Sequence, residues 1–325
     1  MYNVAVTGAS GKSGQYFLKR LLSEKKHVKN LKLFLICRKQ GEHSKNTEGY
    51  QTIQRVLEDC ELQVELVEIN LKNKDELKLF FKENHIDMLL HIASVKLSPY
   101  VVPAALKGGV NNFILVHTTG IYSKYKAAGE EYRQIESKIQ KLVEEYRRKG
   151  RNVAMTILRP TMIYGDLQDK NVSVFIKMVD KLRIFPTVNG ARYDLQPVWC
   201  KDLGDAYYDV MQNWETTQNK EYILSGKDPI QLRAMFEVMA KQLGVKNVFV
   251  SCPYPIAYVG ACIIYALTLK KIDYREKVQR LVEPRAYSHE KAEEDFGYNP
   301  VSFEIGVQGE IQQYQNCKKN RRGYL

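Results

Sequence analysis

The sequence has few of the features that mark metal-binding, disulfide-bonded or disordered chains. Its six cysteines include no Cys-x-x-Cys pair, and its six histidines show no spacing typical of metal ligands. We therefore expect no metal site and no disulfide framework, which is typical of a reducing compartment. Low-complexity tracts, internal repeats and linkers rich in Pro, Gly and Ser are also lacking. With 44% hydrophobic residues among 325, the chain predicts a globular protein with a substantial core.

An apolar run long enough to cross a bilayer is lacking too. Residues 248–269 carry no charge, but Pro253 and Pro255 interrupt them and leave 256–269 as a candidate helix. A helix of that length rises about 21 Å, which is short of a bilayer core. We expect it to pack within a lobe of the protein. The alternative is a peripheral membrane contact through 256–269, assisted by the basic residues at 318–322.

We expect no cleavable signal peptide, because an apolar strand is predicted to begin within three residues of the N-terminus. We therefore expect a cytoplasmic protein. Basic residues outnumber acidic ones by 49 to 37, which gives a formal net charge of +12. This charge favours an anionic partner or is simply a solvated surface. Aromatic and basic residues do not alternate as in an RNA-binding platform, so we expect a phosphorylated small molecule and no nucleic acid.

Strands and helices alternate along the first half of the chain. Short apolar runs predict strands at 2–7, 31–36, 63–69, 86–92, 112–117 and 153–158. Helical patterns follow the first strand and occupy 75–84 and 132–149. This order predicts an α/β fold, namely a Rossmann-type doubly wound parallel sheet with a smaller C-terminal substrate lobe. We expect residues 1–165 to form the Rossmann domain and 166–325 to form the lobe, with about 194–225 returning to the Rossmann elements.

A glycine-rich turn follows the first strand. Residues 7–14 read TGASGKSG, a TGxxGxxG pattern between a strand and a helix. Glycines at this spacing allow a tight turn and let the backbone approach a pyrophosphate, while the helix N-terminus offers free N–H groups to it. The pattern predicts a dinucleotide site, with contacts from Gly8, Ser10, Gly11, Lys12, Ser13 and Gly14.

The residues after the second strand bear on the choice of dinucleotide. An acidic residue there would hold the ribose hydroxyls of NAD, but the chain reads Cys37-Arg38-Lys39. Two cations, together with Lys12 of the glycine turn, suit the 2′-phosphate of NADP. A solvated basic turn is the other interpretation. We therefore predict NADP as the cofactor and keep NAD as the alternative.

Further motifs follow the glycine turn in a fixed order. They are D-x-x-x-H-x-A at 87–93, HTTGIY at 117–122, RPTMIYG at 159–165, QPVWCKDLGDA at 196–206 and EKA…FGYNP at 290–300. Together they resemble the extended branch of the short-chain dehydrogenase/reductase superfamily, in which nucleotide-sugar epimerases and dehydratases are found. The resemblance covers most of the chain, although the segment between Ala93 and Asn112 and the stretch from Tyr122 to Tyr132 are short for an extended member.

The resemblance implies an NAD(P)-dependent epimerase, dehydratase or reductase that acts on a nucleotide sugar, and a homodimer. It also implies further cofactor contacts, at Asn70, Leu71, Ala93, Pro160, Met162 and Ile163. Candidate contacts to the diphosphate of the substrate are Arg192, Arg280 and Arg285, because guanidinium groups suit diphosphate oxygens.

The catalytic residues of the family are a Ser or Thr hydroxyl, a Tyr and a Lys four positions after the Tyr. Carried onto this chain, the hydroxyl is Thr118, or else Thr119, and the acid/base is Tyr132. The Lys position is occupied by Glu136, which is a departure from the pattern. A carboxylate beside a phenol raises the phenol pKa, whereas the family's Lys lowers it.

Two alternatives stay open at this point. The segment 122–126 also contains Tyr-x-x-x-Lys, but Tyr122 stands where the family has its strand-end tyrosine. The second alternative belongs to another class of protein. Because Glu136 replaces the catalytic Lys, the chain could be an NADP-binding sensor or scaffold that has kept the fold and lost the chemistry.

Overall fold

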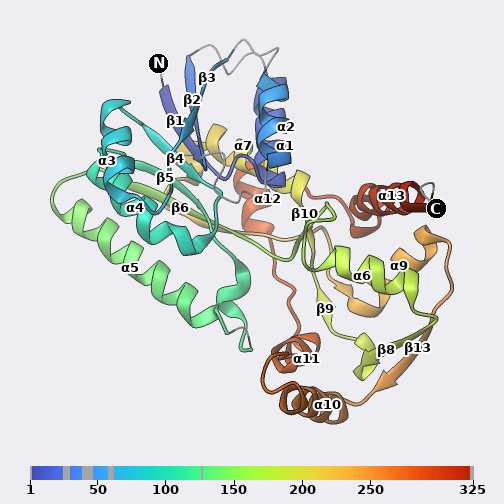
Figure 1. Ribbon diagram of the computed structural model, residues 1–325. Coiled ribbons are helices and arrows are strands. Elements are labelled where there is room, and N and C mark those ends of the chain that lie inside the picture. The colour runs from blue at the N-terminus through green and yellow to red at the C-terminus, as the bar shows by residue number, and fades with distance from the viewer. Residues whose placement is uncertain (1, 25–29, 39–46, 58–61, 126, 323–325) are drawn as a thin grey trace.

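A seven-stranded parallel sheet forms the centre of the molecule (Figure 1). The computed structural model describes residues 2–24, 30–38, 47–57, 62–125 and 127–322. The strands are β1 (Tyr2–Thr7), β2 (Leu31–Cys37), β3 (Gln63–Glu68), β4 (Met88–His91), β5 (Asn112–Val116), β6 (Ala154–Pro160) and β11 (Glu221–Leu224). Their order in the sheet is β11-β6-β5-β4-β1-β2-β3. Successive strands are therefore added on one side of β1 up to β3, and on its other side from β4 onward. Doubly wound folds bind ligands at this switch point between β1 and β4.

Helices cover both faces of this sheet. The helices of the first half are α1 (Lys12–Ser23), α2 (Thr47–Leu57), α3 (Lys74–Glu83), α4 (Ser98–Lys107) and α5 (Gly129–Arg148). Side chains of β1 alternate between the two cores: Val4 and Val6 pack against α1, whereas Ala5 packs with α3, α4 and α5. This alternation is what a parallel sheet buried on both faces requires. The Rossmann-type sheet predicted from the sequence is confirmed; α2 and α4 were not predicted.

The second half of the chain forms the C-terminal lobe and also contributes to the sheet. It contains α6 (Val172–Lys181), β8 (Ile184–Val188), α9 (Leu232–Leu243), β13 (Val248–Cys252), α10 (Tyr254–Leu267), α11 (Arg275–Leu281) and α13 (Phe303–Arg322). Short strand pairs are formed by β7 (Ile163–Tyr164) with β10 (Val198–Trp199) and by β9 (Asp194–Leu195) with β12 (Ile230–Gln231). The elements that return to the sheet are α7 (Cys200–Gln212), α8 (Trp214–Thr217), β11 and α12 (Glu290–Phe296). Among them, β11 pairs with β6 and α7 packs against α1.

The apolar segment of the lobe does form a helix, but this helix is not packed as expected. Of the residues of α10, only Ala261 is buried, while Ile256 and Leu267 are 64% and 79% exposed. The interpretation of 256–269 as a helix covered by the lobe is therefore wrong. Its apolar composition predicts helix formation but does not reveal what covers the helix. Within the described residues, no helix combines the length and the apolar character needed to cross a membrane.

Candidate cofactor and substrate site

The glycine turn joins β1 to α1 at the switch point of the sheet. Gly8 has a φ of +80°, and a Cβ there would lie 2.7 Å from the backbone nitrogen of Ala93 at the end of β4. A Cβ on Gly14 would lie 2.5 Å from the carbonyl oxygen of Gly8. Side chains are therefore excluded where the turn, α1 and the end of β4 meet. Gln15 donates a hydrogen bond to the carbonyl of Ser10 (2.8 Å) and supports the turn.

The N-terminus of α1 fits the phosphates of a dinucleotide. Its N-cap is Gly11, which supplies no side-chain cap, and the first turn contains no acidic residue. The first N–H groups therefore have no side-chain acceptor at the cap and, with Lys12 beside them, form an electropositive helix end. Residues 10–12 also line a small depression of about 50 Å³, which is shared with Asp166 and Gln168.

The other predicted cofactor contacts lie along the same edge of the sheet. Arg38 is exposed directly after β2, whereas Lys39 lies outside the described residues. Asn70 is exposed after β3, where its Oδ1 accepts a hydrogen bond from the backbone of Lys72 (3.0 Å), and Leu71 is buried. Carboxyl ends of parallel strands share one edge, so these residues and the glycine turn can face one extended ligand. Pro160 ends β6, and Met162 and Ile163 follow it.

A larger cleft of about 280 Å³ opens between the sheet edge and the lobe. Its lining includes Thr118 beyond β5 and the segment beyond β6, together with residues of the lobe. The described lining residues are Thr118, Thr119, Gly120, Ser123, Thr161, Met162, Ile163, Asn171, Leu195, Gln196, Arg280, Arg285 and Tyr287. The structure thus brings the predicted hydroxyl, two cofactor candidates and two of the three candidate arginines to one cleft.

Arg280 and Arg285 give the cleft its cationic wall. The Nε atoms of both are buried and have no hydrogen-bond partner among the described residues. Burial, and then the charge of Arg280, lower the pKa of Arg285 to about 10. An anion between the two guanidinium groups would relieve this repulsion and supply the missing acceptors. Arg192 is exposed on the lobe and is not among the residues that line the cleft.

The two candidate hydroxyls differ in their contacts. Thr119 is buried and donates its hydroxyl to the carbonyl of Pro160 (3.2 Å). The Oγ1 of Thr118 accepts a hydrogen bond from the backbone of Gly120 (3.0 Å), so its own hydrogen stays available to a ligand. This favours Thr118 over Thr119 as the group that holds a substrate oxygen.

Tyr132 lies in the first turns of α5, partly buried against the core of that face. It is not among the lining residues of the 280 Å³ cleft. The Nζ of Lys96, which follows β4, stands 6.0 Å from the centre of the Tyr132 ring and 2.5 Å from Glu131. Sequence reasoning missed Lys96 because it belongs to a different strand end, although it follows the 87–93 motif by only three residues.

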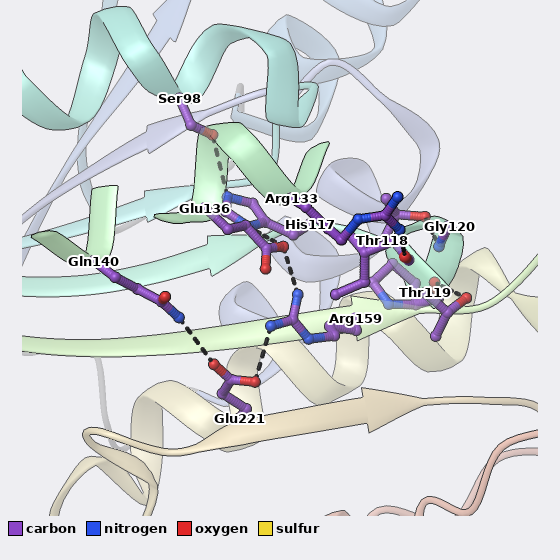
Figure 2. Close-up of polar contacts among 12 residues, drawn as sticks. Ser98, His117, Thr118, Thr119, Gly120, Arg133, Glu136, Gln140, Arg159 and Glu221 are labelled. Atoms are coloured by element: carbon purple, nitrogen blue, oxygen red, sulfur yellow. Dashed lines mark hydrogen bonds and ion pairs between the residues drawn. The ribbon is translucent and has the colours of Figure 1, made fainter. Parts of the chain in front are cut away.

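Glu136 is part of a chain of polar contacts, most of whose members are buried (Figure 2). Its Oε1 accepts hydrogen bonds from Nδ1 of His117 (2.9 Å) and from the guanidinium of Arg159. Arg159 also pairs with Glu221 on β11 (2.8 Å), and Nε2 of His117 lies 3.2 Å from the hydroxyl of Ser98. The carboxylate therefore connects α5 to β5, β6 and, through Arg159, β11.

The contacts of Glu136 decide its charge. Burial opposes ionisation, but the hydrogen bonds from His117 and Arg159 outweigh it and lower the pKa of Glu136. The residue is thus an anion neutralised by its partners, and it acts as a structural ion rather than a substitute for the family's Lys. His91, which is wholly buried and hydrogen-bonded to Thr7 (2.6 Å), has its pKa lowered to about 3 by burial and by His117.

The alternative tyrosine stands beside the cleft. Tyr122 is 47% exposed, and its ring lies 5.6 Å from that of Tyr287, a lining residue. Lys126, the lysine of the alternative Tyr-x-x-x-Lys motif at 122–126, lies outside the described residues. Ser123 and the backbone of Lys124 both donate to Glu283 (2.7 Å each), which fastens this segment to the arginine-bearing wall. Apart from the position of Glu283 between the two arginines, no sequence pattern indicates that contact.

A doubly wound parallel sheet, a glycine turn at its switch point and a cleft beneath a smaller lobe define a dinucleotide-binding protein of the Rossmann class. The NAD dependent epimerase/dehydratase family model matches residues 4–224. The chain belongs to this family, which confirms the resemblance inferred from its motifs.

Solved structures of such enzymes share the fold. UDP-glucose 4-epimerase of Thermotoga maritima, solved with UDP-glucose, is similar with a TM-score of 0.66 at 16% identity, over 97% of this chain and 99% of that one. A dTDP-glucose 4,6-dehydratase from Streptomyces venezuelae, solved with NAD, gives a TM-score of 0.70 at 14% identity, over 97% of both chains.

A curated relative resembles a shorter part of the chain. The mitochondrial NADH dehydrogenase [ubiquinone] 1 alpha subcomplex subunit 9 of Arabidopsis thaliana is 26% identical over 102 residues, which are 31% of this chain. The match spans only a quarter (25%) of that relative's length.

Proposed function

We propose that the protein is an NADP-dependent epimerase, dehydratase or reductase whose substrate is a sugar carried on a diphosphate, as in a nucleotide sugar. The observation that carries this proposal is the pair Arg280 and Arg285, whose buried Nε atoms lack partners in the same cleft as Thr118. Two guanidinium groups suit the several oxygens of a diphosphate. Similar folds solved with UDP-glucose or with NAD support the same class of reaction.

The roles of the residues follow the family resemblance. Thr118 holds the reacting sugar oxygen, and Tyr132 takes the proton of that hydroxyl. Bound NADP⁺ supplies the acceptor for the hydride. Lys96 is the cation beside the Tyr132 ring, and it is also paired with Glu131. The preference for NADP rests on Arg38, which is exposed after β2. The homodimer and the cytoplasmic location stay predictions.

A turnover assay with matched arginine variants tests the proposal. Purified protein is mixed with NADP⁺ or NADPH and a panel of UDP- and dTDP-sugars, while nicotinamide absorbance and product identity are followed. Because a hydrogen bond to a charged group contributes roughly 1.5–3 kcal/mol, Arg280→Ala or Arg285→Ala should raise KM by about 10- to 100-fold and change kcat less. Arg233→Ala, which removes an exposed cation paired with Glu237 on α9, is the control.

The outcomes separate the two classes of function. The proposed site is supported if Arg280→Ala and Arg285→Ala raise KM while Arg192→Ala has a KM close to that of the unmodified protein. Tight NADPH binding without turnover of any sugar would favour a sensor or scaffold. The comparisons do not support that alternative, and only the replacement of the family's Lys by Glu136 favours it.

A further inference from the structure

Helix α10 is an apolar helix that the rest of the described chain leaves uncovered. It contains no charged residue, and Ala261 is its only buried one. A helix that is apolar on every side is normally found in a core or against lipid. Figure 1 shows α10 at one extremity of the lobe, with α11 between it and the remainder of the molecule. The described residues therefore leave most of this helix exposed.

The exposed side chains form a stripe along one face of α10. Ile256, Val259, Ile263 and Leu267 follow one another at intervals of three or four residues, which places them on one side of the helix. Their exposed fractions are 64%, 56%, 53% and 79%. The stripe extends for about 16 Å, at 1.5 Å per residue. Leu269, just beyond the helix, is 81% exposed and continues the apolar surface.

The charged residues that flank α10 along the chain are mostly positive, and the acidic ones after it are Asp273 and Glu276, the latter on α11. No acidic residue stands between Glu237 and Asp273, and Lys270 and Lys271 are exposed directly after the helix. Asp273 is neutralised by Arg275 (2.7 Å), whose guanidinium lies 3.8 Å from the centre of the Tyr265 ring. An apolar stripe bordered by lysines, on a chain of net charge +12, complements a surface that is apolar within and anionic at its boundary.

We infer that α10 lies in the surface of an anionic lipid bilayer, and that docking there presents the cleft to a sugar whose diphosphate is anchored by a lipid in the same bilayer. The statement about the substrate rests on the function proposed above. A second copy of this chain fits the surface less well. Pairing two α10 helices would gather the lysines of both copies around one apolar patch, where they would repel each other.

The path from the bilayer to the cleft is short along the chain. α10 packs directly against α11, which carries Arg280, and Arg285 follows α11 by four residues. Tyr254 and Tyr258 stack at the start of α10 (5.8 Å), as aromatic residues do at a lipid–water boundary. The inference places the diphosphate at the two arginines and the lipid tail beside α10, the helix that contacts the arginine-bearing segment.

Vesicle binding tests the docking surface. Full-length protein is floated with vesicles of equal phosphatidylcholine and phosphatidylglycerol, and with phosphatidylcholine alone. We expect binding to the anionic vesicles and a loss of about tenfold or more in Ile263→Asn/Leu267→Asn, because two large apolar side chains no longer enter the lipid. The matched control is Leu79→Asn/Ile305→Asn, which alters side chains 55% and 57% exposed on α3 and α13. Lys270→Glu/Lys271→Glu should weaken binding most at low salt.

The docking proposal is overturned if the unmodified protein does not float, or if the control double variant loses as much binding as the α10 variant. It is also overturned if light scattering shows a dimer that dissociates only in Ile263→Asn/Leu267→Asn. Thermal unfolding of each variant verifies that the fold is kept, as expected for substitutions of exposed side chains.

Activity measurements test the substrate separately. Turnover of a sugar joined by diphosphate to a polyisoprenoid should rise when vesicles are present, and the α10 variant should lose this gain while its turnover of soluble nucleotide sugars is unchanged. Vesicle binding with turnover of soluble nucleotide sugars alone overturns the lipid-linked substrate and leaves the proposed function intact. Vesicle binding without turnover of either substrate overturns the proposed function and leaves the docking surface intact.

Discussion

The carboxylate of Glu136 and the guanidinium of Arg159 form an ion pair in the interior, with side chains only 7% and 4% exposed. One residue stands at the position of the family's catalytic Lys, and the other belongs to the Arg-Pro motif at the end of β6. The pair therefore uses a position that carries chemistry in the family to hold α5 against the sheet. Restoring a lysine there would place two cations side by side.

Substitutions at Glu136 test this structural role. Glu136→Ala should lower the free energy of unfolding by about 3–5 kcal/mol, because the buried charge of Arg159 loses a partner. Glu136→Lys should lower the free energy of unfolding at least as much as Glu136→Ala does, and it should not increase turnover. Glu136→Met/Arg159→Met should recover part of the loss, since both charges are removed. Urea unfolding gives the three values. A stable Glu136→Lys protein with higher activity would show that the position still serves catalysis.

Glu310 makes the stability depend on pH in the opposite sense to an ion-paired carboxylate such as Glu136. It lies on α13, 1% exposed, and its Oε2 accepts a hydrogen bond from the backbone of Gly165 (3.0 Å). Burial, and then the neighbouring carboxylate of Asp169, raise the pKa of Glu310 to about 10. The folded protein therefore keeps this proton at neutral pH, whereas the unfolded chain releases it near pH 4.5.

The contribution of Glu310 is thus complete below about pH 4.5 and falls as the pH rises toward about 10, by at most about 1.4 kcal/mol per unit. Glu310→Gln mimics the protonated form and should flatten the decline of Tm between about pH 5 and 9. Thermal unfolding of both proteins across this range measures the difference. A decline of equal slope in both would contradict a protonated Glu310.

Tyrosine variants distinguish the two candidates for the catalytic tyrosine, Tyr132 and Tyr122. Tyr132→Phe should lower kcat by about 10²- to 10⁴-fold, the usual contribution of a general acid or base, and leave NADPH binding unchanged. Tyr122→Phe should have a smaller effect, on KM, because the family resemblance places Tyr122 at the strand-end position and not at the catalytic one, while its ring contacts Tyr287 of the cleft. Loss of activity in Tyr122→Phe alone would favour Tyr122, of the motif at 122–126, as the catalytic tyrosine.

Arg38 tests the choice of cofactor. Arg38→Ala should raise the Kd of NADPH by about 10- to 100-fold, because a hydrogen bond to a phosphate contributes roughly 1.5–3 kcal/mol. The Kd of NADH should stay within a factor of about two, since NADH lacks the 2′-phosphate. Fluorescence titration with both nucleotides gives the ratio, and Arg233→Ala is again the control. Equal changes for both nucleotides would indicate a solvated basic turn.

Local patterns predicted the sheet and the glycine turn because both depend on neighbouring residues. The run YNVAVT specifies a buried strand, and the spacing of Gly8, Gly11 and Gly14 specifies the turn that follows it. The partner of Glu136 could not be predicted in this way. Arg159 is 23 residues away and meets Glu136 only after α5 crosses over to bring β6 beside β5.

The arginine candidates show the same limit. The sequence offers Arg192, Arg280 and Arg285 as candidates of the same residue type, yet only the latter two line the cleft. Glu283, which lies between these two in sequence, accepts hydrogen bonds from the segment after β5, a contact across 160 residues. Helix α10 is predicted by its apolar residues, whereas its exposure depends on which elements the fold places nearby.

The pairing of β11 with β6 has a consequence for synthesis on the ribosome. When residue 165 has been made, β6 has no neighbour on its outer side, and α1 lacks the helix that will cover it. An open strand edge and an uncovered apolar helix face are the surfaces that associate with other nascent chains. The nascent protein must therefore wait for some sixty further residues, through β11 at Glu221–Leu224, before its central sheet is closed. Pauses in translation within that interval would expose it longest to aggregation and to chaperones.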